Sequence, residues 1–299
     1  MKRVMIEVPR LLLGVSSLDQ PVRTTRDRQL EVASRFKEPE SLAVALVKGV
    51  AAGAEGVIAP PTLDVREALA ELNKPLPLYA RVLHTSPAED LHWDPVFLAD
   101  QGEETAPTPR TGRRGNKAGA NLLPLSMSGD LASRVLPRME RELALFNAKA
   151  VRGIAVAAAA TDLALAANQP RFFERVVRFA HQRHWLVGVE TRNLGHLLAR
   201  LRAWSLAPDF VIGPVNPRGV GMMPDAPHVL EELKAGTVKV IASELRAGGL
   251  VSLEDGATFA RRHGAWGVCA ELVDMDDVPK ELKGLAALGA AGAAGSAAA

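Results

Sequence analysis

One stretch near the end of the chain constrains the fold more than any other. Residues Val238–Asp274 read VKVIASELRAGGLVSLEDGATFARRHGAWGVCAELVD: a short apolar run, a polar loop with a Gly-Gly pair, an amphipathic helix and a second apolar run. Two strands joined by a helix of this length pair in parallel, since the helix carries the chain back to the starting edge of the sheet. The stretch therefore predicts a βαβ unit.

The same rhythm recurs along the chain. Apolar runs alternate with helical patterns, and the predicted strands are residues 11–16, 56–59, 76–84, 150–157, 185–189, 209–213, 238–242 and 266–270. Several of them are continuously apolar, as strands are when both faces of a sheet are covered. Eight βα units predict a single (β/α)8 (TIM) barrel of the α/β class. An open doubly wound sheet is the alternative, but no G-x-G-x-x-G fingerprint follows the first strand.

The barrel is assigned to residues 1–285. Residues 85–128, between the third strand and the third helix, are predicted to be a long loop or lid insertion, because loops of this length are usually functional or disordered. This insertion carries a basic cluster, interpreted as a mobile loop or an anion-binding lid, at Arg110, Arg113, Arg114 and Lys117. Residues 17–38 are predicted to be a second long loop, and the Ala/Gly-rich residues 286–299 a disordered tail.

The composition limits the kinds of molecule that the protein is expected to bind. The net charge of +2 is too small to indicate a nucleic acid or an anionic membrane. No apolar run approaches the roughly 20 residues that span a bilayer, and no signal-peptide pattern is visible. We therefore expect a cytoplasmic protein that acts on a small-molecule substrate, with a homo-oligomer as a candidate state. The single cysteine, Cys269, lies in the apolar run GVCAEL and is expected to be a core residue.

In a TIM barrel the functional residues lie at the C-terminal ends of the strands. Glu190, Glu244 and Glu271 follow three of the predicted strands, and Asp274 lies just beyond Glu271. Carboxylates there can carry protons or bind a hard cation. His84, at the end of the third strand, is a candidate acid/base or metal ligand. The alternative is that His84 is a hydrogen-bonded rim residue and that the glutamates pair with arginines, namely Arg81, Arg192 or Arg246.

The pieces VIAS, Gly248-Gly249, SLED and HGAWGV give the segment 238–271 a partial resemblance to the phosphate-binding (β/α)8 barrel superfamily. In that superfamily a Gly-Gly loop after the seventh strand helps to hold a phosphate with backbone amides. The resemblance implies a phosphate site at Gly248 and Gly249. Glu244 would repel a phosphate, and a glycine turn before the next helix is the alternative interpretation.

Three functions follow as hypotheses. The first is an isomerase or lyase that acts on a small polar, phosphorylated or carboxylated substrate, with Glu190 as base and His84 or Glu271 as acid. Its substrate-binding candidates are Asn216, Arg246, Gly248, Gly249, Arg192 and Ser243. The second is a divalent-metal enzyme with Glu190, Glu244, Glu271 and His84 as ligands. The third is a non-catalytic scaffolding barrel whose long loops bind a protein.

Two barrel chemistries are disfavoured. A Schiff-base aldolase needs a lysine at the mouth, and both Lys149 and Lys239 stand at strand beginnings. An aldo/keto reductase uses a tyrosine acid, and the only tyrosine, Tyr79, lies early in the third strand.

Overall fold

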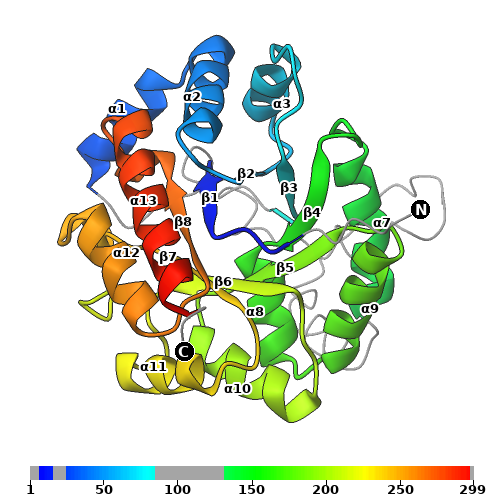
Figure 1. The fold of residues 1–299 in the computed structure, drawn as a ribbon. Helices are drawn as coiled ribbons and strands as arrows, with labels where there is room; N and C mark the ends of the chain where they lie inside the picture. Colours follow the sequence, from blue (N-terminus) through cyan, green and yellow to red (C-terminus); the bar gives the residue numbers. More distant parts are fainter. Residues whose placement is uncertain (1–6, 16–24, 85–130, 297–299) are drawn as a thin grey trace, which may run out of the picture.

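The computed structural model describes residues 7–15, 25–84 and 131–296. Parallel strands close into a barrel in sequence order (Figure 1). The strands are β1 (Leu11–Gly14), β2 (Gly56–Ala59), β3 (Leu78–Val82), β4 (Val151–Val156), β5 (Leu186–Glu190), β6 (Phe210–Pro214), β7 (Val240–Ser243) and β8 (Gly267–Glu271). The predicted (β/α)8 barrel is confirmed. The insertion at 85–128, with its basic cluster, lies outside the described residues.

Helices form a ring around the strands (Figure 1). They are α1 (Arg26–Arg35), α2 (Pro39–Ala51), α3 (Leu63–Ala70), α7 (Leu131–Leu143), α8 (Ala158–Ala166), α9 (Pro170–His181), α10 (Leu194–Trp204), α11 (Ala226–Ala235), α12 (Leu253–Arg262) and α13 (Val278–Ser296). Short 3-10 turns, η3 (Ala247–Gly249) and η4 (Leu272–Asp274), follow β7 and β8. None of the helices in the described ranges is long and apolar enough to cross a bilayer.

Two helices depart from the sequence expectation, and α13 is longer than expected. Helix α1 lies in a segment predicted to be a loop; half of its ten residues are charged, and its Glu31 pairs with Arg28 and Arg35 one turn away on either side. Helix α8 follows β4 directly and has no side-chain cap to mark its start. Helix α13 continues to Ser296, through the Ala/Gly-rich segment that the sequence analysis separates from the barrel at residue 285.

The inside of the barrel has its own apolar core, separate from the larger core between strands and helices. It consists of Val8, Leu12, Ile58, Tyr79, Ala155, Phe210, Ile212, Ile241 and Cys269. The rings of Tyr79 and Phe210 meet edge to face, with centroids 6.0 Å apart. Burial raises the pKa of Tyr79 to about 12, and the nearby charges that affect it, Glu55 and Arg152, belong to strand beginnings. The phenol is thus remote from the C-terminal end of the barrel.

The barrel interior depends on a glycine in β5. A Cβ at Gly188 would overlap the ring of Phe210, which is fully buried and has no room to move. We expect Gly188→Ala to lower the free energy of unfolding by about 1–3 kcal/mol, the usual cost of overpacking a core. Guanidinium unfolding measures it, with Gly284→Ala as control because nothing lies near a Cβ there. Equal stabilities for the two variants would contradict this packing.

Cys269 is buried inside the barrel, as the sequence analysis expects. Burial, and then the charges of Glu271 and Glu190, raise the pKa of its thiol well above the ordinary range. Only the thiolate attacks disulfide reagents. We therefore expect the folded protein to resist an aromatic disulfide reagent at pH 8, and the unfolded chain to release one equivalent of thiolate. Rapid reaction of the folded protein would show that Cys269 is accessible.

Candidate active site

The C-terminal end of the barrel interior is here called the mouth. Several of its inward-facing side chains are charged, whereas those deeper in the barrel are apolar. Side chains alternate along a strand, so the inward positions after Tyr79 and Cys269 are Arg81 and Glu271. Glu190 is likewise the last inward residue of β5. Gly14 lies opposite Glu271 in the β1–β8 register, and a Cβ there would overlap the Glu271 carboxylate. This glycine therefore gives the carboxylate its space at the mouth.

Arg81 holds two of the predicted catalytic residues. Its Nε donates to Glu190 Oε2 at 2.7 Å, and its Nη1 lies 2.6 Å from His84 Nδ1. The side chains of Arg81 and Glu190 are only 4% and 12% exposed. A guanidinium has no acceptor, so Nδ1 must accept and the neutral ring carries its proton on Nε2. The structure thus supports the alternative interpretation of Glu190, a pair with Arg81.

His84 is fixed from α7 as well as from β3. Arg138 Nη2 donates to the His84 carbonyl oxygen at 3.0 Å, and Glu142 Oε2 accepts from the Leu83 amide at 2.6 Å. Burial, and then the positive charges of Arg81 and Arg138, lower the pKa of His84 to about 3. An imidazole that stays neutral near pH 7 has no imidazolium proton to give. This environment argues against His84 as the catalytic acid.

Asp274, at the end of η4, is a titratable group suited to proton transfer near pH 7. Burial, and then the neighbouring carboxylates Glu271 and Glu244, raise its pKa to about 7, although Arg246 and Arg28 act in the opposite direction. A carboxyl group with such a pKa exchanges protons readily at neutral pH.

Arginines hold the backbone around Asp274. Arg246 Nη1 donates to the Asp274 carbonyl oxygen at 2.6 Å. Arg28 of α1 donates to the carbonyl oxygens of Val273 and Met275 at 3.0 and 3.1 Å, and Arg35 donates to the latter at 3.2 Å. These bonds join α1 and the β7–α12 connection to the segment after β8. They fix the position of Asp274 relative to the mouth.

The four predicted metal ligands do not come together. In the part of the chain that the structure describes, no group of three or more His, Cys, Asp or Glu side chains is arranged to hold a metal ion. Glu190 and His84 are both engaged by Arg81, whereas Glu244 and Glu271 act electrostatically on Asp274. The proposed set Glu190, Glu244, Glu271 and His84 is therefore not assembled as a metal site.

The Gly-Gly turn is closed by its own backbone. The Gly249 amide donates to the Arg246 carbonyl oxygen at 2.9 Å, and Gly248 and Gly249 both have positive φ, at 74° and 93°. Glycine adopts this left-handed conformation without a steric penalty. An amide used in the turn is not available to a phosphate. At Gly249 the structure supports the turn rather than the phosphate cradle.

The other predicted substrate-binding residues differ in their surroundings. Asn216 is buried and uses both ends of its amide on the backbone of Val220, at 2.9 and 3.0 Å, so it shapes its own loop. Arg192 has an exposed side chain, and its amide donates to Asp162 Oδ2 at 3.1 Å. Ser243 ends β7 two residues after the inward-facing Ile241 and is half-buried at the mouth.

Arg246 combines a fixed position with a spare donor. It is half-buried, and one of its terminal nitrogens is bound to the Asp274 carbonyl oxygen. Its Nε is buried without a hydrogen-bond partner among the described residues. A buried guanidinium N–H that lacks a partner costs free energy unless an acceptor arrives. Of the predicted substrate-binding residues, Arg246 has the clearest capacity to bind an anionic group.

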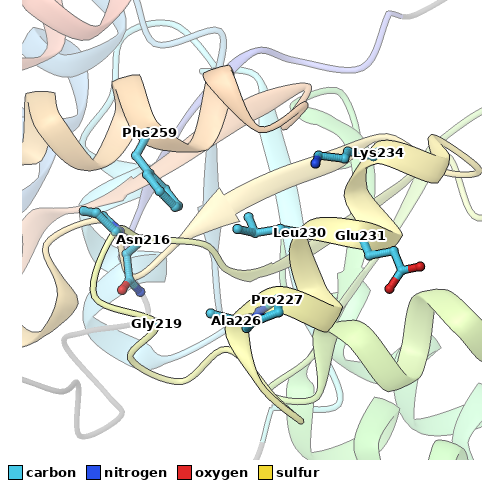
Figure 2. Close-up of a pocket in the computed structure, with 9 residues that line it drawn as sticks. Asn216, Gly219, Ala226, Pro227, Leu230, Glu231, Lys234 and Phe259 are labelled. Carbon is cyan, nitrogen blue, oxygen red and sulfur yellow. The ribbon is translucent and has the colours of Figure 1, made fainter.

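A pocket of about 600 Å³ lies beside the barrel, between the loop after β6, helix α11 and Phe259 of α12. Figure 2 shows Phe259 and Leu230 extending toward the space between their helices. Its walls are mainly apolar. It shares only Asn216 with the sequence candidates, so it is separate from the charged mouth.

The sequence pointed to Glu190, Glu271 and His84, and to Arg81 as a partner of the glutamates, but not to Arg138 and Glu142, which hold the end of β3 from α7. Arg138 and Glu142 are four apart on an amphipathic helix, where such a pair usually lies in solvent. Asp162 of α8 accepts from Thr191 Oγ1 at 2.5 Å and thereby anchors the backbone that follows Glu190. Asp162 has a sequence signal, since it follows the end of β4 closely, whereas Arg138 and Glu142 lie within a helix and have none.

The fold and the site together define a (β/α)8 barrel with a charged mouth. No protein-family model matches the chain, and no curated protein matches it. Among solved structures, a Pseudomonas aeruginosa protein described as an aldo-keto reductase is similar in fold, with 12% identity, a TM-score of 0.48, and 95% of this chain and 91% of that chain covered. The N-acetylmannosamine-6-phosphate 2-epimerase of Clostridium perfringens is similar too, with 10% identity, a TM-score of 0.42, and 91% and 90% covered. The fold assignment rests on the closed barrel itself.

Proposed function

We propose that the mouth is the active site of an isomerase or lyase that moves a proton on a small polar substrate. The observation that carries this proposal is Asp274, a half-buried carboxyl group whose pKa is raised to about 7 by burial and by Glu271, and whose backbone Arg246 holds in place. A structural carboxylate is normally stabilised in its ionised form. The ionised form of Asp274 is instead destabilised by burial and by the neighbouring carboxylates. Groups poised in this way cluster at catalytic sites.

The roles of the rim residues follow from their partners. Asp274 takes the substrate proton as base and returns it as acid, with Glu271 keeping its affinity for the proton high. Arg81 and Glu190 form a buried pair that sets the charge at the floor of the mouth. Glu190 thus orients and balances charge, and Asp274 replaces it as the proposed base.

The substrate class follows from Arg246 and from the filled interior of the barrel. Arg246 offers a buried Nε donor to a carboxylate or phosphate oxygen of the substrate. The barrel below the mouth is filled by its apolar core, so the substrate lies on this floor rather than inside the barrel. A small metabolite with one anionic group and an acidic C–H bond fits these conditions.

Proton abstraction can be tested before the natural substrate is known. The protein is incubated in D2O with a panel of 2-keto acids, 2-hydroxy acids and sugar phosphates, and proton NMR follows loss of the C–H signal next to the carbonyl or hydroxyl. We expect deuterium to enter at least one compound, with a rate that rises through pH 7 as Asp274 ionises. Absence of exchange across the whole panel would contradict the proposal.

Substitutions test whether this deuterium exchange takes place at the mouth. Because general acid–base catalysis contributes about 10²–10⁴-fold, Asp274→Asn should slow exchange by at least about 100-fold. Glu254→Gln, on the exposed face of α12, is the matched control and should leave the rate unchanged. If Asp274→Asn kept the full rate, Asp274 would have no part in the reaction.

A further inference from the structure

The outer faces of α1, α2 and α3 carry apolar side chains that the fold leaves uncovered. Within the described ranges, four of the seven large hydrophobic residues with exposed side chains lie on these three helices: Leu30, Val44, Val47 and Leu63. The helices follow one another along one side of the barrel, drawn in blue shades in Figure 1. Val44 and Val47, on α2, are 50% and 45% exposed. Apolar surface gathered in this way marks interaction sites more often than scattered residues do.

The exposed face of α2 borders a groove. The groove has a volume of about 720 Å³ and lies between α2 and the connection from α3 to β3. Its apolar wall includes Val44 and Val47 on one side and Leu72 and Leu76 on the other. Charged side chains line it as well, namely Glu40, Lys48, Glu71 and Lys74. A helix of a partner could pack its side chains into such a groove.

The charges on α2 are arranged with opposite signs about an apolar centre. Glu40, Val44 and Lys48, here called the α2 ridge, are each four residues apart and so lie in one row along the helix. The two charged positions are about 12 Å apart along the axis. Glu40 is near the N-terminus of α2 and Lys48 near its C-terminus, and neither forms an ion pair within the described part of the chain.

We propose that this surface binds a second copy of the chain through a two-fold contact of α2 against α2. In an antiparallel pair centred on Val44, Glu40 of each copy faces Lys48 of the other, and the two valines meet on the axis. The same patch therefore complements itself, which a two-fold interface requires. Antiparallel packing also opposes the two helix dipoles favourably.

The α3–β3 connection adds to this complementarity. Lys74 lines the groove at the end where α2 carries Lys48, so the incoming Glu40 meets two cations there, although Glu71 is also nearby. An arbitrary partner would need to supply a matching sequence of acidic, apolar and basic groups, whereas a second copy already has it. The contact lies on the outer helices, so it is independent of the chemistry proposed for the mouth.

Charge reversal tests the two-fold arrangement. Sedimentation equilibrium of the full chain should show a dimer. Glu40→Lys and Lys48→Glu should each weaken it by about tenfold or more, since each turns two attractive pairs into repulsive ones. The double variant E40K/K48E exchanges the partners across the axis and should recover most of the lost affinity, with a remaining loss because Lys74 keeps its positive charge. Glu231→Lys, on the exposed face of α11, is the control and should not change it.

A cysteine at the axis supplies a second, geometric readout. Val44→Cys should cross-link to its own counterpart with a short bismaleimide and yield a covalent dimer. The unmodified chain, whose Cys269 is buried, should not. A wild-type chain that stays monomeric at millimolar concentration would overturn the proposal. So would a dimer that the charge reversals leave unchanged, that E40K/K48E fails to restore, or that does not cross-link through residue 44.

Discussion

Arg81→Met should destabilise the protein more than any other single change at the mouth. The variant removes the only cation that the structure shows bonded to Glu190 among the described residues, and leaves a carboxylate that is only 12% exposed at the mouth. Breaking a buried ion pair by removing one partner costs about 3–5 kcal/mol, because the remaining charge is desolvated and uncompensated. Guanidinium unfolding at pH 7 measures this loss. The variant also frees His84 of a neighbouring positive charge, so the pKa of His84 should rise.

The matched control removes both charges. Arg81→Met combined with Glu190→Leu replaces the pair by apolar side chains of similar size, and such replacements are often neutral for stability. We therefore expect the double variant to recover most of the loss. If it is as unstable as Arg81→Met alone, the cost arises from packing and not from the unpaired carboxylate. If Arg81→Met itself is as stable as the wild type, the pair is not buried as described.

Asp274→Asn should make the protein more stable at alkaline pH. The folded state holds a proton on Asp274 up to about pH 7, whereas the unfolded chain loses it near the ordinary value of 3.8. The stabilising contribution of this proton is thus fully present below about pH 4 and is lost as the pH rises through 7. Asparagine cannot ionise. The variant should gain up to roughly 4 kcal/mol over the wild type at pH 9, since one pKa unit corresponds to about 1.4 kcal/mol.

This prediction is checked by measuring the unfolding free energies of the wild type and of Asp274→Asn between pH 4 and pH 9. The difference between them should be close to zero at pH 4 and should grow up to about pH 7. Asp255→Asn, at an exposed position in the first turn of α12, is the control for the loss of a carboxylate elsewhere on the protein. If the difference in unfolding free energy were constant between pH 4 and pH 9, Asp274 would have the pKa of an ordinary carboxyl group. Stability gained at the expense of proton transfer is the usual trade-off at an active site.

The barrel could be predicted from sequence because strand runs such as VIAS and GVCAEL are apolar on both faces and recur with helices between them. Local sequence patterns did not predict the elements whose formation depends on tertiary contacts. Helix α1 buries little apart from Val32, and its arginines bond to backbone oxygens after β8, more than two hundred residues away. Helix α8 lacks a capping residue and is rich in alanine, so neither its start nor its face is marked.

The sequence indicated candidate residues at the strand ends, but not the surroundings of their side chains. Strand ends pointed to Glu190, Glu271 and His84, because every barrel gathers its strand ends at one mouth. Their environments depend on groups from other strands and helices: Arg81 bonds to Glu190 and His84, and Arg138 also fixes His84 from α7. The pKa of Asp274 likewise arises from burial and from neighbours brought close by folding, which no spacing along the chain reveals.

The most direct test of this account is a titration of the Asp274 carboxyl group. Carbon-13 NMR of protein labelled at aspartate side chains follows each carboxyl resonance from pH 3 to pH 9, and the Asp274→Asn variant identifies the signal. The account predicts one aspartate that titrates near pH 7 and disappears in that variant. An Asp274 resonance that titrates near pH 4, like a solvated carboxyl group, would contradict the proposed proton-transfer site at the mouth.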